Sequence, residues 1–247
     1  MRITALLCFL AAAVMLPGAP AAAQEAPEGY VMVKVKMTKR VTRLVANPAD
    51  QIDRDAIAAY GPFRVLDAAR AALVDETDEA SPAHFAAMLR NHPGITALHF
   101  VECPGTLDDR SNLRLGRMIR EAGLDAVVPE NGSVRSGAVE LVLAGRHLTI
   151  EDGAQFAVHA WMDDRGMGAH DYAPDSPEHT KYLAYYREMG LRADVAQRFY
   201  AMTNSVDFND ARWLDGAEMR GWLGLDTAAD ATGQLAAAPA LSYDLAL

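Results

Sequence analysis

Apolar and polar positions along the chain follow two periods, which predict strands and helices in alternation. Between residues 30 and 37, valines alternate with lysines, and a period of two is typical of a half-buried strand. Residues 95–101 and 125–128 are short apolar runs, as in buried strands. The segment between them carries one apolar face at helical spacing, formed by Leu115, Met118, Ile119 and Ala122. Strands alternating with helices predict parallel crossover units, so we expect an α/β fold with helices covering a sheet.

Further segments extend this alternation. Residues 81–91 begin with Ser-Pro, which predicts a helix with proline in its first turn. Residues 137–144 are almost entirely apolar and predict a buried helix, and short strands are expected at 148–150 and 156–160. Residues 215–218 (Asp-Gly-Ala-Glu) have the spacing of a capping box, which predicts one more helix after them.

The first 23 residues have the composition of a secretory signal peptide. Arg2 precedes an apolar run over residues 3–16, and small residues follow as far as Ala23. An apolar run of this length is too short to span a bilayer comfortably, so we expect cleavage after Ala23. The mature protein is therefore expected to be periplasmic or secreted.

Composition divides the remainder of the chain into three parts. Residues 24–66 hold a polar linker and short elements broken by Asn-Pro and Gly-Pro pairs, and we expect an N-terminal appendage there. Residues 67–226 carry the helix and strand pattern of the main domain. Residues 227–247 are rich in alanine and are expected to form a flexible tail. The formal net charge of −10 argues against nucleic acid as a partner.

Cys103 is the only cysteine outside the predicted signal peptide, so no disulfide is expected within the mature chain. It follows an apolar run, which favours a buried side chain that acts as a small hydrophobe. A catalytic thiol remains an alternative if His159 faces it.

Candidate acyl-transfer chemistry comes from three places in the main domain. Ser136 stands on a small-residue turn that opens the 137–144 helix, and His159 follows twenty-three residues later. A serine hydroxyl needs a base to take its proton and donors to stabilise the oxyanion, and backbone amides at Gly105 and Gly137 could supply those donors. Alone, Ser136 could also be a helix cap, and His159 could be a packed, hydrogen-bonded side chain.

Four segments resemble the proteolytic subunit of Clp protease and its periplasmic relatives, whose superfamily includes the enoyl-CoA hydratases. They are residues 100–106 (Phe-Val-Glu-Cys-Pro-Gly-Thr), 136–145, 157–160 and 213–218. The resemblance implies a Clp/crotonase-type superhelix of ββα crossover units and a homo-oligomer, and it implies no cofactor and no metal. Its implied site has four residues: the nucleophile Ser136, the base His159, and the oxyanion amides of Gly105 and Gly137.

Two positions depart from the family pattern. Thr106 stands where the family's oxyanion loop has a second glycine, which would narrow the site. Ala211 stands where the family has its acid, with Asp210 next to it and Asp207 nearby. We take Asp210 as the candidate third catalytic residue, and a Ser136–His159 dyad remains the alternative. A third residue matters because it fixes the imidazole tautomer.

Other polar and aromatic groups have weaker patterns. A metal site could be formed by His170, Asp171, Asp175 and His179, but their spacing matches no zinc pattern and favours a polar loop. Tyr182, Tyr185 and Tyr186, with Trp161, could line a substrate groove or pack against the sheet. Glu140 is unusual in an apolar helix, and we assign it no role.

These patterns favour a periplasmic serine hydrolase, and among hydrolases a peptidase, acting on a peptide or an ester. A second hypothesis is a binding or scaffold module that kept the fold and lost the acid. A third is an acyl-CoA hydratase or thioesterase, which a carboxylate base near the oxyanion loop would favour.

Overall fold

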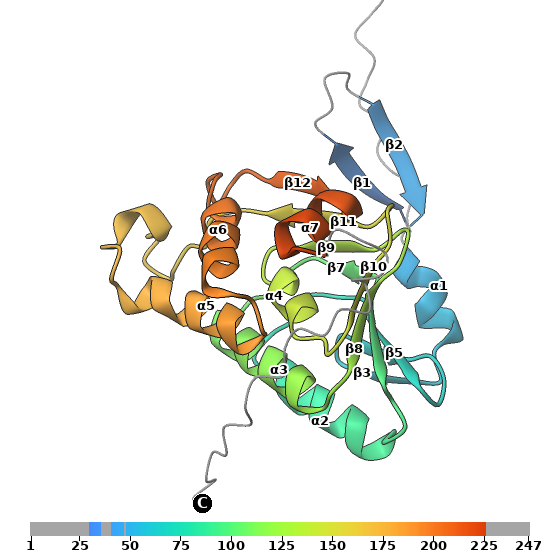
Figure 1. Ribbon diagram of the computed structural model, residues 1–247. Helices are drawn as coiled ribbons and strands as arrows, with labels where there is room; N and C mark the ends of the chain where they lie inside the picture. The colour runs from blue at the N-terminus through green and yellow to red at the C-terminus, as the bar shows by residue number, and fades with distance from the viewer. Residues whose placement is uncertain (1–29, 36–40, 47, 226–247) are drawn as a thin grey trace, which may run out of the picture. The chain divides into compact units, whose positions relative to one another are not determined.

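The computed structural model describes residues 30–35, 41–46 and 48–225 (Figure 1). The predicted signal peptide and the tail of residues 227–247 lie outside the described residues. The chain divides into two units after Val45. In the first unit, β1 (Tyr30–Val35) pairs with β2 (Val41–Ala46) in a two-stranded sheet, and β1 is the strand predicted from the valine–lysine alternation.

The larger unit is built around a six-stranded sheet of order β10-β8-β6-β5-β4-β3. Four of its strands are parallel: β5 (Arg70–Leu73), β6 (Ala97–Phe100), β8 (Asp125–Val128) and β10 (Leu148–Ile150). Two antiparallel strands extend one edge: β3 (Ala58–Tyr60) and β4 (Phe63–Val65). These two strands belong to the 24–66 segment, so part of that segment completes the sheet and the chain divides earlier, after Val45.

A second sheet has four strands in the order β12-β11-β9-β7. Its parallel members are β7 (Glu102–Cys103), β9 (Ser133–Arg135) and β11 (Gln155–Val158), and β12 (Arg212–Asp215) is antiparallel to β11. Along the chain, β6 leads to β7, β8 to β9 and β10 to β11. Each crossover unit therefore gives one strand to each sheet, and the prediction of an α/β fold of ββα units is confirmed.

Seven helices lie in the described part of the chain: α1 (Pro48–Asp55), α2 (Ser81–Asn91), α3 (Asp109–Glu121), α4 (Ala138–Leu143), α5 (Pro177–Glu188), α6 (Ala193–Thr203) and α7 (Gly216–Leu223). The capping box predicted for α7 is present, with Asp215 and Glu218 each accepting from the other's backbone N–H. Among these helices, none combines the length and apolarity needed to cross a membrane.

Strand β5 shows why both faces of the six-stranded sheet are covered. Its Ala71 and Leu73 are fully buried in the main core, while Ala72 packs on the other face with Ala49 of α1. Successive side chains of a strand point to opposite faces, so an apolar run fits a strand buried on both sides. Figure 1 shows α2 and α3 along one side of this sheet and α1 along the other.

Candidate active site

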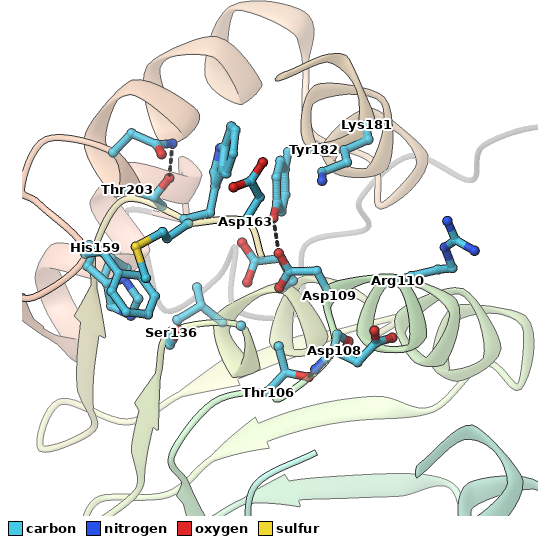
Figure 2. A pocket seen from close by; sticks show the side chains of 18 of the residues that line it. Thr106, Asp108, Asp109, Arg110, Ser136, His159, Asp163, Lys181, Tyr182 and Thr203 are labelled. Carbon is cyan, nitrogen blue, oxygen red and sulfur yellow. Dashed lines mark hydrogen bonds between the residues drawn. The ribbon is translucent and has the colours of Figure 1, made fainter. Parts of the chain in front are cut away.

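A cavity of about 450 Å³ lies where β9 and β11 end, and helices α4, α5 and α6 contribute to its walls. Its lining includes three of the predicted site residues, Ser136, Gly137 and His159. Figure 2 shows Ser136 and His159 toward one end of the cavity, with Lys181 and Arg110 toward the other. The structure therefore brings the predicted alcohol and imidazole to one cavity.

Ser136 holds a strained backbone conformation. Its φ is 49°, the only positive value for a non-glycine residue in the described part of the chain. Such a conformation costs about 1–3 kcal/mol and persists only where the surroundings enforce it. Here the Ser136 N–H donates to the carbonyl of Ala157 (2.8 Å), and the Ser136 carbonyl accepts from Val139 N–H (3.0 Å). The turn is thus tied to β11 on one side and to α4 on the other.

The Ser136 hydroxyl does not serve as a helix cap. Gly137 occupies the N-cap position of α4, and no hydrogen bond from Ser136 Oγ is found among the described residues. The side chain is half-buried and lines the cavity. The structure therefore favours the functional interpretation of Ser136 over the capping one.

Two glycines allow the oxyanion loop to approach Ser136. A Cβ on Gly105, whose φ is +143°, would lie 3.0 Å from Ser136 Cβ. A Cβ on Gly137 would lie only 2.5 Å from Thr106 Cγ2. Gly105 itself is not part of the cavity lining, whereas Thr106 and Gly137 are. Any larger side chain at either glycine would push the loop away from the serine.

Thr77 and Asn112, which sequence reasoning missed, hold this loop in place. Thr77 N–H donates to the Gly105 carbonyl (3.0 Å), and the single hydroxyl proton of Thr77 has two acceptors within reach, Asn112 Oδ1 (3.0 Å) and the Gly105 carbonyl (3.3 Å). Asn112 Nδ2 donates to the Gly137 carbonyl (2.6 Å). Both side chains are buried. The two halves of the site are therefore joined through one buried polar bridge.

This bridge also determines where the neighbouring N–H groups point. The Gly105 C=O and the Thr106 N–H belong to one trans peptide and point in opposite directions. Because the Gly105 carbonyl is bonded to Thr77, the Thr106 N–H points away from Thr77. Within the described residues, the N–H groups of Gly105, Thr106 and Gly137 donate no hydrogen bond. Unpaired amides beside a serine hydroxyl are the donors that an oxyanion needs. The geometry adds Thr106 to the two predicted donors.

The His159 ring is oriented by a backbone carbonyl. Its Nδ1 lies 2.9 Å from the Ala160 carbonyl oxygen, which can only accept, so Nδ1 carries the proton in this contact. Nε2 is then free to act as a base. The ring also meets Phe208 edge-on, with 5.0 Å between centroids. No hydrogen bond joins His159 to Ser136 among the described residues, and such bonds often tighten only when substrate is bound.

The structure does not bring Asp210 to this ring. Asp210 is exposed and absent from the cavity lining, and its Oδ1 accepts from Ala211 N–H (2.9 Å). It makes no hydrogen bond with His159 in the described chain. The Ala160 carbonyl thus occupies the orienting position that the sequence led us to expect for Asp210.

The opposite wall is aromatic and comes from α5, α6 and the segment after β11. Trp161 Nε1 donates to Tyr200 Oη (2.8 Å), which in turn contacts His179 Nδ1 (2.8 Å). Tyr182 stacks on Trp161 and on Tyr200, with centroid distances of 6.1 and 6.0 Å. Trp161 and Tyr182 line the cavity and also pack against neighbouring rings. For these two residues, lining a groove and packing in the fold are therefore both true.

Five carboxylates also line the cavity: Asp108, Asp109, Glu140, Asp163 and Asp164. Glu140 is 8% exposed, and its Oε1 accepts from Tyr186 Oη (2.8 Å). Burial, with a smaller contribution from the charge of Asp109, raises the pKa of Glu140 to about 7, against the lowering effect of the Tyr186 hydrogen bond. Asp109 accepts from Tyr182 Oη. In the sequence, the only sign of the buried carboxylate Glu140 was a single acidic residue within the apolar run that forms α4.

The other candidates do not reach the cavity as reactive groups. Cys103 is fully buried, its Sγ donates to the Leu73 carbonyl (3.4 Å), and burial raises the pKa of its thiol far above the usual range. It is a small core residue and not a nucleophile. In the described ranges, no group of three or more His, Cys, Asp or Glu side chains is placed to hold a metal ion.

No protein-family model and no curated protein matches the chain. A serine-to-alanine mutant of the 1510-N membrane-bound stomatin-specific protease is similar in structure, with a TM-score of 0.42 and 14% identity over 63% of this chain and 74% of that one. A lysine-to-alanine mutant of that protease, in complex with a substrate peptide, has a TM-score of 0.40 and 13% identity over 60% and 70%. The ClpP protease catalytic domain from Plasmodium falciparum has a TM-score of 0.39 and 11% identity over 62% and 79%.

Proposed function

We propose that this protein is an exported serine hydrolase that cleaves a peptide or an ester. One observation carries the proposal: a strained serine lies beside backbone amides and shares a cavity with His159, and neither these amides nor His159 Nε2 has a hydrogen-bond partner among the described residues. Strain and unpaired polar groups persist in a fold where function needs them.

In the proposed mechanism, His159 Nε2 takes the proton of Ser136 Oγ as the oxygen attacks the substrate carbonyl carbon. The negative charge that forms on the carbonyl oxygen is held by the N–H groups of Gly137 and the 105–106 loop. The histidine then gives its proton to the leaving amine or alcohol, and the scissile bond breaks. Water repeats the sequence on the acyl-serine and restores the hydroxyl.

A fluorophosphonate probe tests this mechanism, because it forms a covalent bond only with an activated serine. We expect the full-length protein to be labelled, Ser136→Ala to be unlabelled, and His159→Gln to be labelled much more slowly. Ser205→Ala, at an exposed serine bonded to the Met202 carbonyl, is the matched control and should be labelled normally. Equal labelling of Ser136→Ala, or no labelling of the wild type, would leave the binding or scaffold hypothesis.

A second function is favoured by the carboxylates. Glu140 and Asp109 line the same cavity as Thr106 of the oxyanion loop, which is the arrangement that a hydratase acting on an acyl thioester would use for acid–base chemistry. Hydration of an enoyl thioester that survives Ser136→Ala and is lost in Glu140→Gln would establish this function instead.

Export follows from the predicted signal peptide and is part of the same proposal. Expression of the whole chain in a Gram-negative host, followed by N-terminal sequencing of the periplasmic fraction, should give a mature protein that begins at Gln24. An intact N-terminus in the cytoplasmic fraction would contradict it.

A further inference from the structure

Beyond Ser136, the cavity presents acidic and aromatic side chains. Asp109 and Glu140 come from α3 and α4, and Trp161 and Tyr182 provide ring faces. The lining also holds two cations, Lys181 and Arg110. Lys181 Nζ is bound to a surface carboxylate, Glu178 (2.6 Å), and Arg110 is exposed.

Glu140 retains one oxygen for a ligand. Its Oε1 accepts from Tyr186, while no other described residue donates to Oε2. A buried carboxylate without full hydrogen bonding is costly, so natural proteins keep one mainly where it acts on something. Glu140 belongs to the first turn of α4, whose N-cap Gly137 directly follows Ser136, and both Ser136 and Glu140 line the cavity.

Asn204 provides an independent observation on the far wall. It lines the cavity at 6% exposure, and its Oδ1 has no hydrogen-bond partner in the described chain. Its Nδ2 donates to the Tyr200 carbonyl (2.8 Å) and to Thr203 Oγ1 (3.2 Å). A buried acceptor that no protein group satisfies calls for a donor from outside.

The ring faces at this end of the cavity already attract a cation. Lys181 Nζ lies 5.4 Å from the centre of the Trp161 ring and 5.2 Å from that of Tyr182. Such distances are those at which an ammonium is attracted by an aromatic quadrupole. Carboxylates, an unpaired acceptor and aromatic faces together fit a ligand that is positively charged and rich in N–H donors.

The outer rim fits a polypeptide. The described chain exposes four large hydrophobic side chains, and three of them, Leu107, Met162 and Phe208, line this one cavity. Exposed apolar groups gathered at one opening indicate a binding surface. Apolar contacts at the rim would hold the backbone of a bound peptide while one side chain enters.

We propose that the part of the cavity formed by Asp109, Glu140 and Asn204 binds a lysine- or arginine-like side chain next to the bond that Ser136 attacks. This inference rests on the proposed hydrolase function and adds its substrate class, a peptide with a basic residue before the scissile bond.

Cation binding at this site depends on pH. Glu140 contacts Tyr185 and Tyr186 on α5 and feels the charge of Asp109 on α3. The other titratable or charged side chains of the lining are Asp108, Arg110, His159, Asp163, Asp164, Lys181, Tyr182 and Tyr200. The tyrosines stay neutral, because burial raises their pKa values well above neutrality. Glu140 is largely ionised above its raised pKa of about 7, so binding of a cation strengthens from pH 6 to pH 8.

Two measurements test the proposal on the full-length protein. In the first, diphenyl phosphonates with lysine-like, leucine-like and glutamate-like side chains compete with the fluorophosphonate probe, and the lysine-like inhibitor should react fastest. In the second, the fluorescence of 4-aminobenzamidine reports cation binding, with neutral 4-aminobenzamide as the ligand control. Glu140→Gln and Asp109→Asn should each weaken benzamidine binding about 10- to 100-fold at pH 8.

Controls separate this inference from the hydrolase proposal. Glu121→Gln, an exposed carboxylate at the other end of α3, should bind benzamidine like the wild type, and Glu140→Gln should lose the pH dependence. Labelling without preference for the lysine-like inhibitor would overturn the cation site and leave the hydrolase. Glu140-dependent benzamidine binding without any labelling would keep the cation site and overturn the hydrolase. Neither labelling nor binding would overturn both.

Discussion

The two walls of the cavity are built in different ways. On the Ser136 wall, main-chain groups do the positioning: a strained serine, two close glycines, and carbonyls held by Thr77 and Asn112. On the aromatic wall, side chains of α5 and α6 position one another through rings and hydroxyls. Backbone positions admit almost no adjustment, whereas side chains can repack. Substitutions on the Ser136 wall are therefore expected to slow the reaction strongly. Substitutions on the aromatic wall are expected to be tolerated better, because its side chains can repack around a ligand.

The largest effect is expected where the first wall has no spare room. Gly137→Ala places a Cβ 2.5 Å from Thr106 Cγ2, so the 105–106 loop must move away from Ser136. A displacement of about 1 Å at a reacting centre can cost about 100-fold in rate. We expect a loss of that order in the rate of fluorophosphonate labelling, with unfolding free energy lowered by about 1–3 kcal/mol from overpacking.

A second substitution checks that the close contact is the cause. Thr106→Ser removes the methyl group that the new Cβ would meet, so the double variant should regain much of the lost rate. Thr106→Ser alone should be labelled nearly as fast as the wild type. If the double variant is as slow as Gly137→Ala, the loss comes from the backbone of the turn and not from loop displacement.

Glu140 joins the two walls, and its titration should weaken the fold as pH rises. The carboxyl belongs to α4 but is bonded to Tyr186 of α5, and burial raises its pKa from 4.5 to about 7. Between these values the folded state holds a proton that the unfolded state has released, so unfolding free energy falls as pH increases. At pH values above the raised pKa, the unfolding free energy has fallen by about 3 kcal/mol in total.

Glu140→Gln removes this titration while keeping an acceptor for Tyr186. Urea unfolding at pH 5 and pH 9 should show that the variant gains stability relative to the wild type at pH 9 and little at pH 5. Glu121→Gln is again the exposed control and should change neither value. A wild type whose stability rises over this range would contradict the assignment of a buried, mostly neutral Glu140.

The first wall could be predicted from sequence better than the second because its features are local. Ser136 and Gly137 are adjacent, and the glycine loop precedes a helix of clear amphipathic pattern. Thr77 was missed because its partner Asn112 lies 35 residues away, and Glu140 because Tyr186 lies 46 residues away. No periodicity encodes such pairs, since they exist only once the chain has folded.

The same limit explains the elements that were not predicted. Strands β7 and β9 have two and three residues, too few for a period of two to be visible in the sequence. They form strands because β11 and its neighbours supply their hydrogen-bond partners. Their omission mattered little for the site, since Ser136 follows β9 directly and was already placed on a turn.

A smaller effect is expected from the buried bridge, and a substitution on the other wall sharpens the comparison. Thr77→Val keeps the shape but leaves Asn112 Oδ1 without its donor, which costs about 1–3 kcal/mol of unfolding free energy. Because Asn112 then loses a partner that fixes its amide on the Gly137 carbonyl, labelling should also slow. Tyr200→Phe deprives Trp161 of its acceptor at a similar cost in stability. Its labelling rate should stay near that of the wild type, and equal slowing of both variants would remove the distinction between the walls.

The smallest effect is expected from Asp210, and it decides what orients His159. In the structure the Asp210 carboxylate is exposed and bonded to Ala211 N–H, while the ring is held by the Ala160 carbonyl. Substitutions at exposed positions away from special features change free energies by about 0.5 kcal/mol or less, so Asp210→Asn should alter the labelling rate by less than about twofold. A carboxylate that orients a catalytic imidazole would instead leave the wrong tautomer when amidated, with a loss of about 10⁴-fold. The labelling rate of Asp210→Asn, measured from pH 6 to 9, shows which group orients the His159 ring. The Ala160 carbonyl is still present in this variant, so a rate near that of the wild type supports the carbonyl. A large drop in rate would show that Asp210 reaches the ring when substrate binds.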